Sequence, residues 1–372
     1  MTTELYHNIC DYLRELIAGT EWEGIVYAVG GCCRDELMNL PIKDLDLAVN
    51  RPDGGIRFGR WLYEQGLTVD EPTEFVKYGT SKLNLTEFPE DEIELVQTRR
   101  EKYTDRTSRN PETAFGSIED DCVRRDLTIN SLYYDITNRK FIDITNRGVD
   151  DIKNHIIRTP NDPDVTYDDD PVRILRCIRF ATRFGWDIEP ETYAAMVRNV
   201  DRMNIVSVER IRGELEKILL CDNPSRGLEL LRQTGAMRFV IPELEKTYSL
   251  DQNHRHFGTV WEHTLKVVDK VPEDIYLRMA ALLHDIGKIT TRVIGSDGEV
   301  HYPRHERVGR LVNKILRRLR YRSDFIKKIE FLVVNHTVTK RMGDTIDAAC
   351  LPGIRRIQYK CTTRKRFNAL MA

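Results

Sequence analysis

The chain has 372 residues, longer than one typical hydrophobic core supports, so we expect two or three domains. Its 41% hydrophobic and 31% charged residues are typical of a soluble globular protein, and no apolar run is long enough to span a membrane. With no signal-peptide pattern in the first residues, we expect a cytoplasmic location. A net charge of −2 excludes a uniformly basic nucleic-acid binder. The eight cysteines have no paired metal spacing, which predicts reduced thiols in the core.

Two adjacent glycines join a predicted strand to a predicted short helix. Residues 26–29 are apolar and predict the strand, and residues 33–40 predict the helix. Gly30 and Gly31 allow a tight turn that approaches a phosphate with no Cβ in between. The first amides of the helix favour an anion there. Because a glycine pair alone also makes ordinary turns, the pattern needs a second signal.

That second signal is a pair of aspartates beside the next strand. Residues 45–49 alternate and predict a strand, on which Asp44 and Asp46 share one face. Two neighbouring carboxylates repel each other unless a cation lies between them, and Mg²⁺ suits them because it prefers oxygen ligands and substrate phosphates. The alternative is that both are solvated surface charges. Together with the glycine turn, the pair predicts a magnesium-dependent nucleotide phosphate site.

Further strands are predicted near residues 77–85 and at residues 92–98. Glu94 lies on the second of these and is a candidate third carboxylate beside the two aspartates. A triad of carboxylates suggests two metal ions, one on the incoming triphosphate and one on the attacking hydroxyl. Residues 100–122 are polar and without a period, which predicts a long functional or disordered loop.

The segment RRDLTINSLYYD carries candidate nucleotide ligands. Arg124 and Arg125 can neutralise phosphate charge, and Asp126 and Asn130 can hydrogen-bond ribose hydroxyls. Paired arginines are commonly surface charge, but the whole segment favours the functional interpretation.

Residues 168–185 predict a helix whose beginning can read a base. Asp170 and Arg173 are three residues apart and present an acceptor beside donors, which complements cytosine and, after a small rotation, adenine. Uracil and guanine would leave buried polar groups unpaired, at a cost of roughly 1–3 kcal/mol each. Arg176 and Arg179 lie on turns suited to triphosphate or RNA, with a helix-bracing salt bridge as the alternative for Arg179.

These motifs resemble those of the tRNA nucleotidyltransferase and bacterial poly(A) polymerase family. GGCCRDELMNLPIKDLD is similar to the family pattern GGxVRDxLLGxxxxDxD, with Cys33 for valine and Asn39 for glycine. RRDLTINSL is similar to RRDFTINAL, and DDPVRILRCIRFATR is similar to EDPxRxLRxxRFAxR. The resemblance implies an α+β fold: a polymerase β-like head with a mixed sheet, an all-α neck and body, and a helical HD domain.

The resemblance also implies roles for individual residues. Asp44 and Asp46 would bind the catalytic metal, and Glu94 would assist them. Asp170 and Arg173 would recognise the base, with Asp169 positioning the arginine. The full nucleotide-binding set would be Gly30, Gly31, Arg34, Arg124, Asp126, Asn130, Asp169, Asp170, Arg173, Arg176 and Arg179. The segment 100–122 matches a flexible loop that the family needs for the last adenosine, and its full length favours complete CCA addition.

The second half contains a different histidine pattern. A helical His284-Asp285 pair with His263 about twenty residues upstream resembles the HD phosphohydrolase superfamily. Imidazole and carboxylate can hold a second divalent metal that activates water against a phosphate ester. His305 and His336 are further candidate ligands. Isolated histidines are more often surface or core residues than metal ligands. An HD domain with catalytic activity and one without it are therefore both possible interpretations.

Basic residues are concentrated in the segments 317–328 and 355–366, where they can contact a phosphate backbone. The alternative is a solvated helix face or, for the tail, a polar disordered segment.

We expect a head at 1–140, a neck and body at 141–245, an HD domain at 246–345 and a basic tail at 346–372. The predicted activity is addition of C, C and A to the 3′ end of tRNA from CTP and ATP. The alternatives are a poly(A) polymerase, a partial adder, or an RNA-binding protein with a vestigial site.

Overall fold

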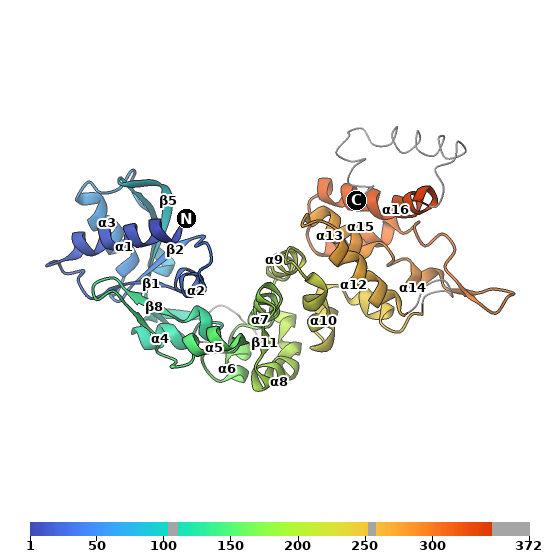
Figure 1. The fold of residues 1–372 in the computed structure, drawn as a ribbon, viewed down its shortest axis with the longest axis horizontal. Coiled ribbons are helices and arrows are strands. Elements are labelled where there is room, and N and C mark those ends of the chain that lie inside the picture. Colours follow the sequence, from blue (N-terminus) through green and yellow to red (C-terminus); the bar gives the residue numbers. More distant parts are fainter. Residues whose placement is uncertain (103–110, 252–257, 344–372) are drawn as a thin grey trace. The chain divides into compact units, whose positions relative to one another are not determined.

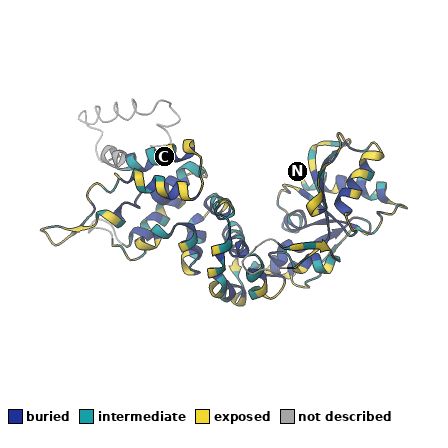
Figure 2. Cartoon of the chain, turned by 180° about the vertical axis from the view of Figure 1, so that it is seen from behind, coloured by how far each residue is buried: buried dark blue, intermediate teal, exposed yellow. Residues whose placement is uncertain are grey.

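The computed structural model describes residues 1–102, 111–251 and 258–343, the last seven by their backbone alone. The chain forms two compact units (Figure 1). The first unit comprises residues 1–173 and 186–205, and the second comprises residues 174–185 and those from 206 onward. Residues 141–173 and 186–205, expected in the neck and body, thus group with the head. In Figure 2, buried residues run through the sheet and along the inner faces of the helices.

The head is built on one mixed sheet of seven strands in the order β3-β4-β5-β2-β1-β8-β9. Only β2 and β5 pair in parallel, and every other neighbouring pair is antiparallel. The strands are β1 (Val26–Val29), β2 (Leu45–Val49), β3 (Thr73–Phe75), β4 (Thr80–Leu85), β5 (Phe88–Gln97), β8 (Tyr133–Asp135) and β9 (Lys140–Ile142). The remaining head elements are α1 (Thr3–Ile17), α2 (Gly31–Leu37), α3 (Gly54–Glu64), the 3₁₀ turns η1 (Val76–Tyr78) and η2 (Thr128–Asn130), and α4 (Ile118–Val123).

The predicted strands at 26–29 and 45–49 are confirmed as β1 and β2. The helix expected at 33–40 is α2. It begins at Gly31, because Gly30 takes a positive φ of 81° and serves as its N-cap. Asn39 follows this helix with φ 53°, a conformation that asparagine tolerates where the family pattern has glycine.

The prediction of an irregular segment at 100–122 is wrong for its described ends. β6 (Arg99–Lys102) and β7 (Glu112–Phe115) pair as an antiparallel ribbon. α4 follows with a capping box, in which Ser117 and Asp120 exchange side-chain to backbone hydrogen bonds. The spacing of this serine and aspartate was the missed sequence signal. The centre of the segment, residues 103–110, lies outside the described residues.

Helices dominate the rest of the described residues, which also form two short two-stranded sheets. The elements that follow the head sheet are α5 (Gly148–Asn154), β10 (Ile156–Ile157), α6 (Pro163–Asp169), α7 (Val172–Phe184), β11 (Asp187–Ile188), α8 (Pro190–Asn199) and η3 (Val200–Ile205). The second unit continues with α9 (Val208–Leu219), α10 (Pro224–Gln233), α11 (Met237–Val240) and η4 (Pro242–Thr247). Its last described elements are α12 (Val260–Lys270), α13 (Ile275–Leu283), α14 (Lys288–Thr291), β12 (Val293–Ile294), β13 (Val300–His301), α15 (Gly309–Arg318) and α16 (Ser323–Gly343).

This architecture confirms the expected fold class, a mixed-sheet head followed by helical regions. Within the described ranges, every helix is too short or too polar to span a bilayer. Six cysteines lie in these ranges, and all six are buried free thiols, as predicted: Cys10, Cys32, Cys33, Cys122, Cys177 and Cys221.

Helix α3 covers the face of the sheet that bears Leu47 and Leu95. The helix comes so close that a Cβ at Gly55 would overlap the Leu95 carbonyl oxygen and lie 2.5 Å from that of Gly79. Because side chains alternate along a strand, Asp46 and Glu94 point away from α3. The carboxylate face therefore stays open to ligands.

We expect Gly55→Ala to destabilise the fold by about 1–3 kcal/mol, because α3 must shift away from two backbone carbonyls. The control is Gly213→Ala in α9, where a Cβ meets nothing within 4 Å and the better helix propensity of alanine applies. Thermal unfolding followed by circular dichroism should show a lower midpoint for Gly55→Ala and no decrease for Gly213→Ala. Equal midpoints would contradict the close approach of α3.

Candidate active site

Strand register places three charged side chains in one row across the sheet. Asp46 on β2 pairs with Glu94 on β5, and Glu94 pairs with Lys82 on β4. The Lys82 ammonium lies 2.7 Å from a Glu92 carboxylate oxygen and 3.5 Å from one of Glu94. Asp44 is exposed and directly precedes β2. The structure thus groups the carboxylates of the predicted triad and adds a lysine that sequence reasoning missed.

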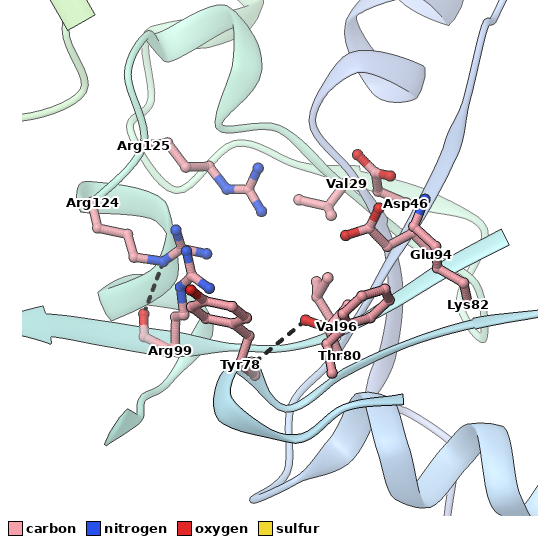
Figure 3. A pocket seen from close by; sticks show the side chains of 11 residues that line it. Val29, Asp46, Tyr78, Thr80, Lys82, Glu94, Val96, Arg99, Arg124 and Arg125 are labelled. Carbon is pink, nitrogen blue, oxygen red and sulfur yellow. Dashed lines mark hydrogen bonds and ion pairs between the residues drawn. The ribbon is translucent and has the colours of Figure 1, made fainter. Parts of the chain in front are cut away.

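A cavity of about 470 Å³ opens on this face (Figure 3). Figure 3 shows Asp46 and Glu94 on one side of it and Arg99, Arg124 and Arg125 on the other. The lining is completed by Val29, Phe75, Tyr78, Thr80, Lys82 and Val96. A neighbouring hollow of about 550 Å³ contains Asp44 and shares Asp46, Lys82 and Glu94 with the first. The charges of the cavity are therefore separated into an acidic and a basic wall.

The acidic wall is electrostatically unfavourable without a cation. Burial, followed by the nearby charge of Glu94, raises the pKa of Asp46 to about 6, with Asp44 adding to the effect and Arg125 opposing it. In the described part of the chain, groups of three or more metal-type ligand atoms within 4.8 Å of one another occur in the second unit only. The head carboxylates are more loosely grouped, as suits an ion that takes further ligands from phosphates.

One buried carboxylate holds the basic wall in place. Asp121, which is fully buried, accepts hydrogen bonds from the guanidinium groups of Arg124 and Arg125 and from the Tyr133 hydroxyl at 2.7 Å. Burial alone would raise the pKa of Asp121, but the two arginines lower it far below its usual range. Sequence reasoning missed this residue, although its spacing of three and four residues from Arg124 and Arg125, which follow α4, was a signal.

The glycine turn lies against Arg125 of the basic wall. Gly30 has φ 81°, and a Cβ there would lie 3.2 Å from Nη1 of Arg125. Gly31 begins α2. Gly30 therefore brings bare backbone beside the basic wall, whereas a Cβ at Gly31 would lie 3.6 Å from Nη2 of Arg34. The contact of this turn with a phosphate stays a prediction.

Three other predicted nucleotide ligands bond to one another. Arg34 is buried, pairs with Asp35 at 2.7 Å and donates to the Asn130 side-chain oxygen. The Asn130 amide donates to an Asp126 carboxylate oxygen at 3.0 Å. All three lie outside the lining of the 470 Å³ cavity. The structure places them as a buried network behind the glycine turn.

The predicted base-reading residues lie where α6 gives way to α7. Asp170 is extended, with φ −139° and ψ 94°, and precedes α7 rather than lying inside it. Arg173 donates to the Arg124 carbonyl oxygen at 2.6 Å and to that of Thr166 at 3.3 Å. Burial raises the pKa of Asp169, an effect that Arg173 opposes. The arginine is thus fixed beside the basic wall.

Glu101, a second buried carboxylate that the sequence did not reveal, also contacts this arginine. Its carboxylate lies 2.9 Å from Arg99, 3.3 Å from Arg124 and 3.7 Å from Arg173. The ribbon strand β6 therefore contributes to the position of Arg173, the predicted base-reading arginine. Further along α7, Arg179 pairs with Glu214 on α9 at 2.7 Å, the bracing alternative, and Arg176 lies 6.0 Å from the Phe180 ring.

The second unit gathers four histidines around one aspartate. The Nε2 atoms of His263 and His284 lie 3.6 and 3.1 Å from Oδ2 of Asp285, and those of His305 and His336 lie 3.3 and 3.8 Å from Oδ1. Lys288 contacts Oδ2 at 2.8 Å. The two sets of candidate ligands, His263, His284 and Asp285 on one side and Asp285, His305 and His336 on the other, share the aspartate.

The histidine tautomers favour a cation at this cluster. The Nδ1 atoms of His284, His305 and His336 face backbone carbonyl oxygens at 2.6–3.0 Å, so Nδ1 carries the proton and Nε2 faces the carboxylate. Burial and the neighbouring His284 lower the pKa of His336 to about 4, which keeps it neutral. Burial alone would raise the pKa of Asp285, but His284, His305 and Lys288 lower it well below its usual range.

The basic segment 317–328 has acidic and aromatic partners in the structure. Arg318 donates twice to the Glu243 carboxylate at 2.6 Å, and Arg320 pairs with Glu209. Lys328 lies 4.3 Å from the Tyr276 ring. These contacts are consistent with a solvated helix face, the alternative to a phosphate-backbone contact for this segment. The tail at 346–372 lies outside the described residues.

Comparison with known proteins gives three consecutive family matches. The Poly A polymerase head domain matches residues 26–158, the probable RNA and SrmB-binding site of polymerase A matches residues 185–247, and the HD domain matches residues 254–354. A crystal structure of the Bacillus stearothermophilus CCA-adding enzyme in complex with CTP superposes with a TM-score of 0.67 at 21% identity, covering 99% of this chain and 79% of that one. This likeness shows a shared fold.

Curated relatives give the family. The mitochondrial CCA tRNA nucleotidyltransferase of Saccharomyces cerevisiae is 35% identical over 224 residues, which are 55% of this chain and 40% of that enzyme. The multifunctional CCA protein of Chromobacterium violaceum is 32% identical over 343 residues, 85% of this chain and 75% of the relative. Since this second match spans head, neck and HD regions in one alignment, the chain belongs to the family of CCA tRNA nucleotidyltransferases and multifunctional CCA proteins.

Proposed function

We propose that the protein transfers nucleotides from CTP and ATP to the 3′ hydroxyl of tRNA, adding C, C and A and releasing pyrophosphate. The observation that carries this proposal is the cavity whose acidic wall faces three arginines. Nucleotidyl transfer needs both, because triphosphate charge must be neutralised while a hydroxyl is brought to the α-phosphate. The family relationship supports the proposal, with tRNA, CTP and ATP as partners. The cytoplasmic location stays a prediction from the sequence.

The carboxylates of the acidic wall fit a divalent cation, for which we propose Mg²⁺ held by Asp46 and Asp44 with Glu94 assisting. The pKa of Asp46 is raised first by burial and then by repulsion from Glu94, and a bound cation would offset both effects. Such an ion would neutralise phosphate charge and make the attacking hydroxyl more acidic. Lys82 keeps Glu94 in place from the neighbouring strand, with its ammonium 3.5 Å from the carboxylate.

The arginines of the basic wall would bind the triphosphate. Asp121 fixes the guanidinium groups of Arg124 and Arg125, so little side-chain entropy is lost when phosphates bind. Arg173, held against the Arg124 backbone, would read the base together with Asp170. A carboxylate acceptor at Asp170 favours the amino groups of cytosine and adenine over the carbonyls of uracil and guanine.

A primer-extension assay tests the proposed activity. Purified protein with Mg²⁺ receives tRNAs ending before C, after C and after CC, with each labelled triphosphate singly and in combination. We expect growth that uses only CTP and ATP and stops at CCA. Asp46→Asn should reduce the rate at least about 100-fold, because a metal ligand worth several kcal/mol in the transition state is lost. Glu90→Gln, an exposed change in the neighbouring hollow, should leave the rate nearly unchanged.

Each contrary result identifies an alternative. Growth that stops at CC would indicate a partial adder, and a long A tail on generic RNA would indicate a poly(A) polymerase. If tRNA binds but neither the parent nor Asp46→Asn incorporates nucleotide, the protein is an RNA binder with a vestigial site.

Base selection is tested by Asp170→Asn. The amide offers a donor to the uracil carbonyl, so we expect discrimination against UTP to fall roughly tenfold, within the 1–3 kcal/mol cost of an unpaired group. Asp168→Asn, which changes a neighbouring carboxylate paired with Arg202, is the matched control. The measurement is the ratio of kcat/KM for CTP to that for UTP on one tRNA. An equal ratio in both variants would remove Asp170 from base selection.

The histidine cluster supports a second candidate function, metal-dependent phosphate ester hydrolysis. His263, His284, His305 and His336 direct ring nitrogens at both oxygens of Asp285, a donor set that suits a divalent transition metal. A cation there would activate water for attack on phosphorus. The Lys288 ammonium, which lies 2.8 Å from Oδ2 of Asp285, would contact a phosphate oxygen of the ester.

We expect Asp285→Asn to abolish metal-dependent hydrolysis of bis-p-nitrophenyl phosphate while nucleotide transfer stays within about twofold, since the two sites use different residues. The matched control is Asp297→Asn, which alters an exposed His301-Asp297 pair in the same unit. Hydrolysis and Mn²⁺ binding by calorimetry are measured in parallel. Hydrolysis that survives in Asp285→Asn, or is absent from the parent with every divalent metal, would refute a catalytic cluster.

A further inference from the structure

Two exposed aromatic rings lie on the cavity wall in the head. Phe75 and Tyr78 are 42% and 46% exposed, and both line the cavity that contains Asp46 and Glu94. Figure 3 shows the Tyr78 ring at the edge of the cavity near Arg99 and Thr80. Large aromatic side chains bury well, so two that face an open polar cavity suggest a ligand that covers them.

The local backbone holds both rings at this edge. Phe75 ends β3 and pairs with Thr80 on β4. Between them, the turn η1 closes at Gly79, where φ is 62° and a Cβ would lie 2.5 Å from the Gln97 side chain. The Thr80 hydroxyl donates to the Tyr78 carbonyl oxygen at 3.4 Å. The aromatic pair is therefore part of the sheet edge.

The proposed reaction brings two different bases to this site, and they need different contacts. The incoming base must be chosen, which requires polar groups such as Asp170 and Arg173, both outside the lining of this cavity. The base at the RNA 3′ end changes as nucleotides are added, so its contact must accept different bases. Stacking on an aromatic ring does so, because every base has a π face.

The charges beside the rings also suit an RNA end. Arg99, Arg124 and Arg125 line the same cavity, and the Lys77 ammonium lies 5.6 Å from the centroid of the Tyr78 ring. A nucleotide whose base covers the rings thus finds the Lys77 ammonium beside it for its phosphate, while the arginines hold the triphosphate. Its 3′ hydroxyl would face the acidic wall.

We propose that Phe75 and Tyr78 form a stacking platform for the 3′-terminal base of the RNA that receives the nucleotide. This inference rests on the proposed transfer reaction and assigns its acceptor subsite. The platform is built from an aromatic pair on the β3-η1 segment, apart from the glycine turn and the base-reading residues.

The test compares Tyr78→Ala and Phe75→Ala with two controls. Tyr78→Phe keeps the ring, and Val76→Ala changes a 72% exposed residue of the same turn that lies outside the cavity lining. We expect each ring deletion to raise KM for tRNA lacking CCA at least about fivefold, while KM for CTP stays within about twofold. Both controls should behave like the parent.

A second readout needs no turnover. The tRNA carries 2-aminopurine as its 3′-terminal base, whose fluorescence falls on stacking. Binding to the parent should quench it, and Tyr78→Ala should restore it. The platform is refuted if fluorescence is unchanged by ring deletion, if KM for tRNA is unchanged, if KM for CTP rises instead, or if Val76→Ala has the same effect. If the parent transfers no nucleotide, the proposed reaction fails, and Tyr78-dependent quenching alone decides whether the rings stack on RNA.

Discussion

The parallel pairing of β2 with β5 is the constraint on which the head site depends. It sets Asp46 against Glu94 and, through β4, Glu94 against Lys82. A slip of one residue would turn Glu94 toward α3 and place Leu95 in the cavity, because side chains alternate along a strand. The close approach of α3 at Gly55 opposes such a slip, so the packing of the far face secures the register of the charged one.

Two carboxylates fix the side chains of the basic wall, which faces Asp46 and Glu94 across the cavity. Asp121 and Glu101 each contact at least two arginines, so four cations, Arg99, Arg124, Arg125 and Arg173, are fixed by two anions. The arginines carry excess positive charge at fixed positions, and their mutual repulsion is partly offset inside the protein. In the proposed reaction, a triphosphate in the cavity would meet donors that are already oriented, an electrostatic arrangement that favours nucleotidyl transfer.

Local patterns in the sequence predicted the parts of the structure that local physics determines. The strands at 26–29 and 45–49 follow from apolar runs and alternation, and the glycine turn follows from the need for a positive φ at Gly30. The family motifs led to the metal and base-reading candidates, whose roles stay predictions. Glu101 and Lys82 were missed because strand pairing and helix packing bring most of their partners near, whereas Asp121 had a local signal in its spacing from Arg124 and Arg125. The ribbon of β6 and β7 was missed because its strands are polar and short.

In the proposed reaction, recognition of bases would divide between a polar and an aromatic surface of the head. A carboxylate and a guanidinium distinguish donors from acceptors, so a polar pair such as Asp170 and Arg173 suits a base that must be selected. An aromatic face ignores that pattern, so Phe75 and Tyr78 suit a base that must only be held. A template-independent polymerase needs both surfaces on the same active site, because each nucleotide it adds is first selected and then becomes the acceptor. Sequence motifs reveal the polar surface more readily, since exposed aromatic residues on a short turn have no distinctive spacing.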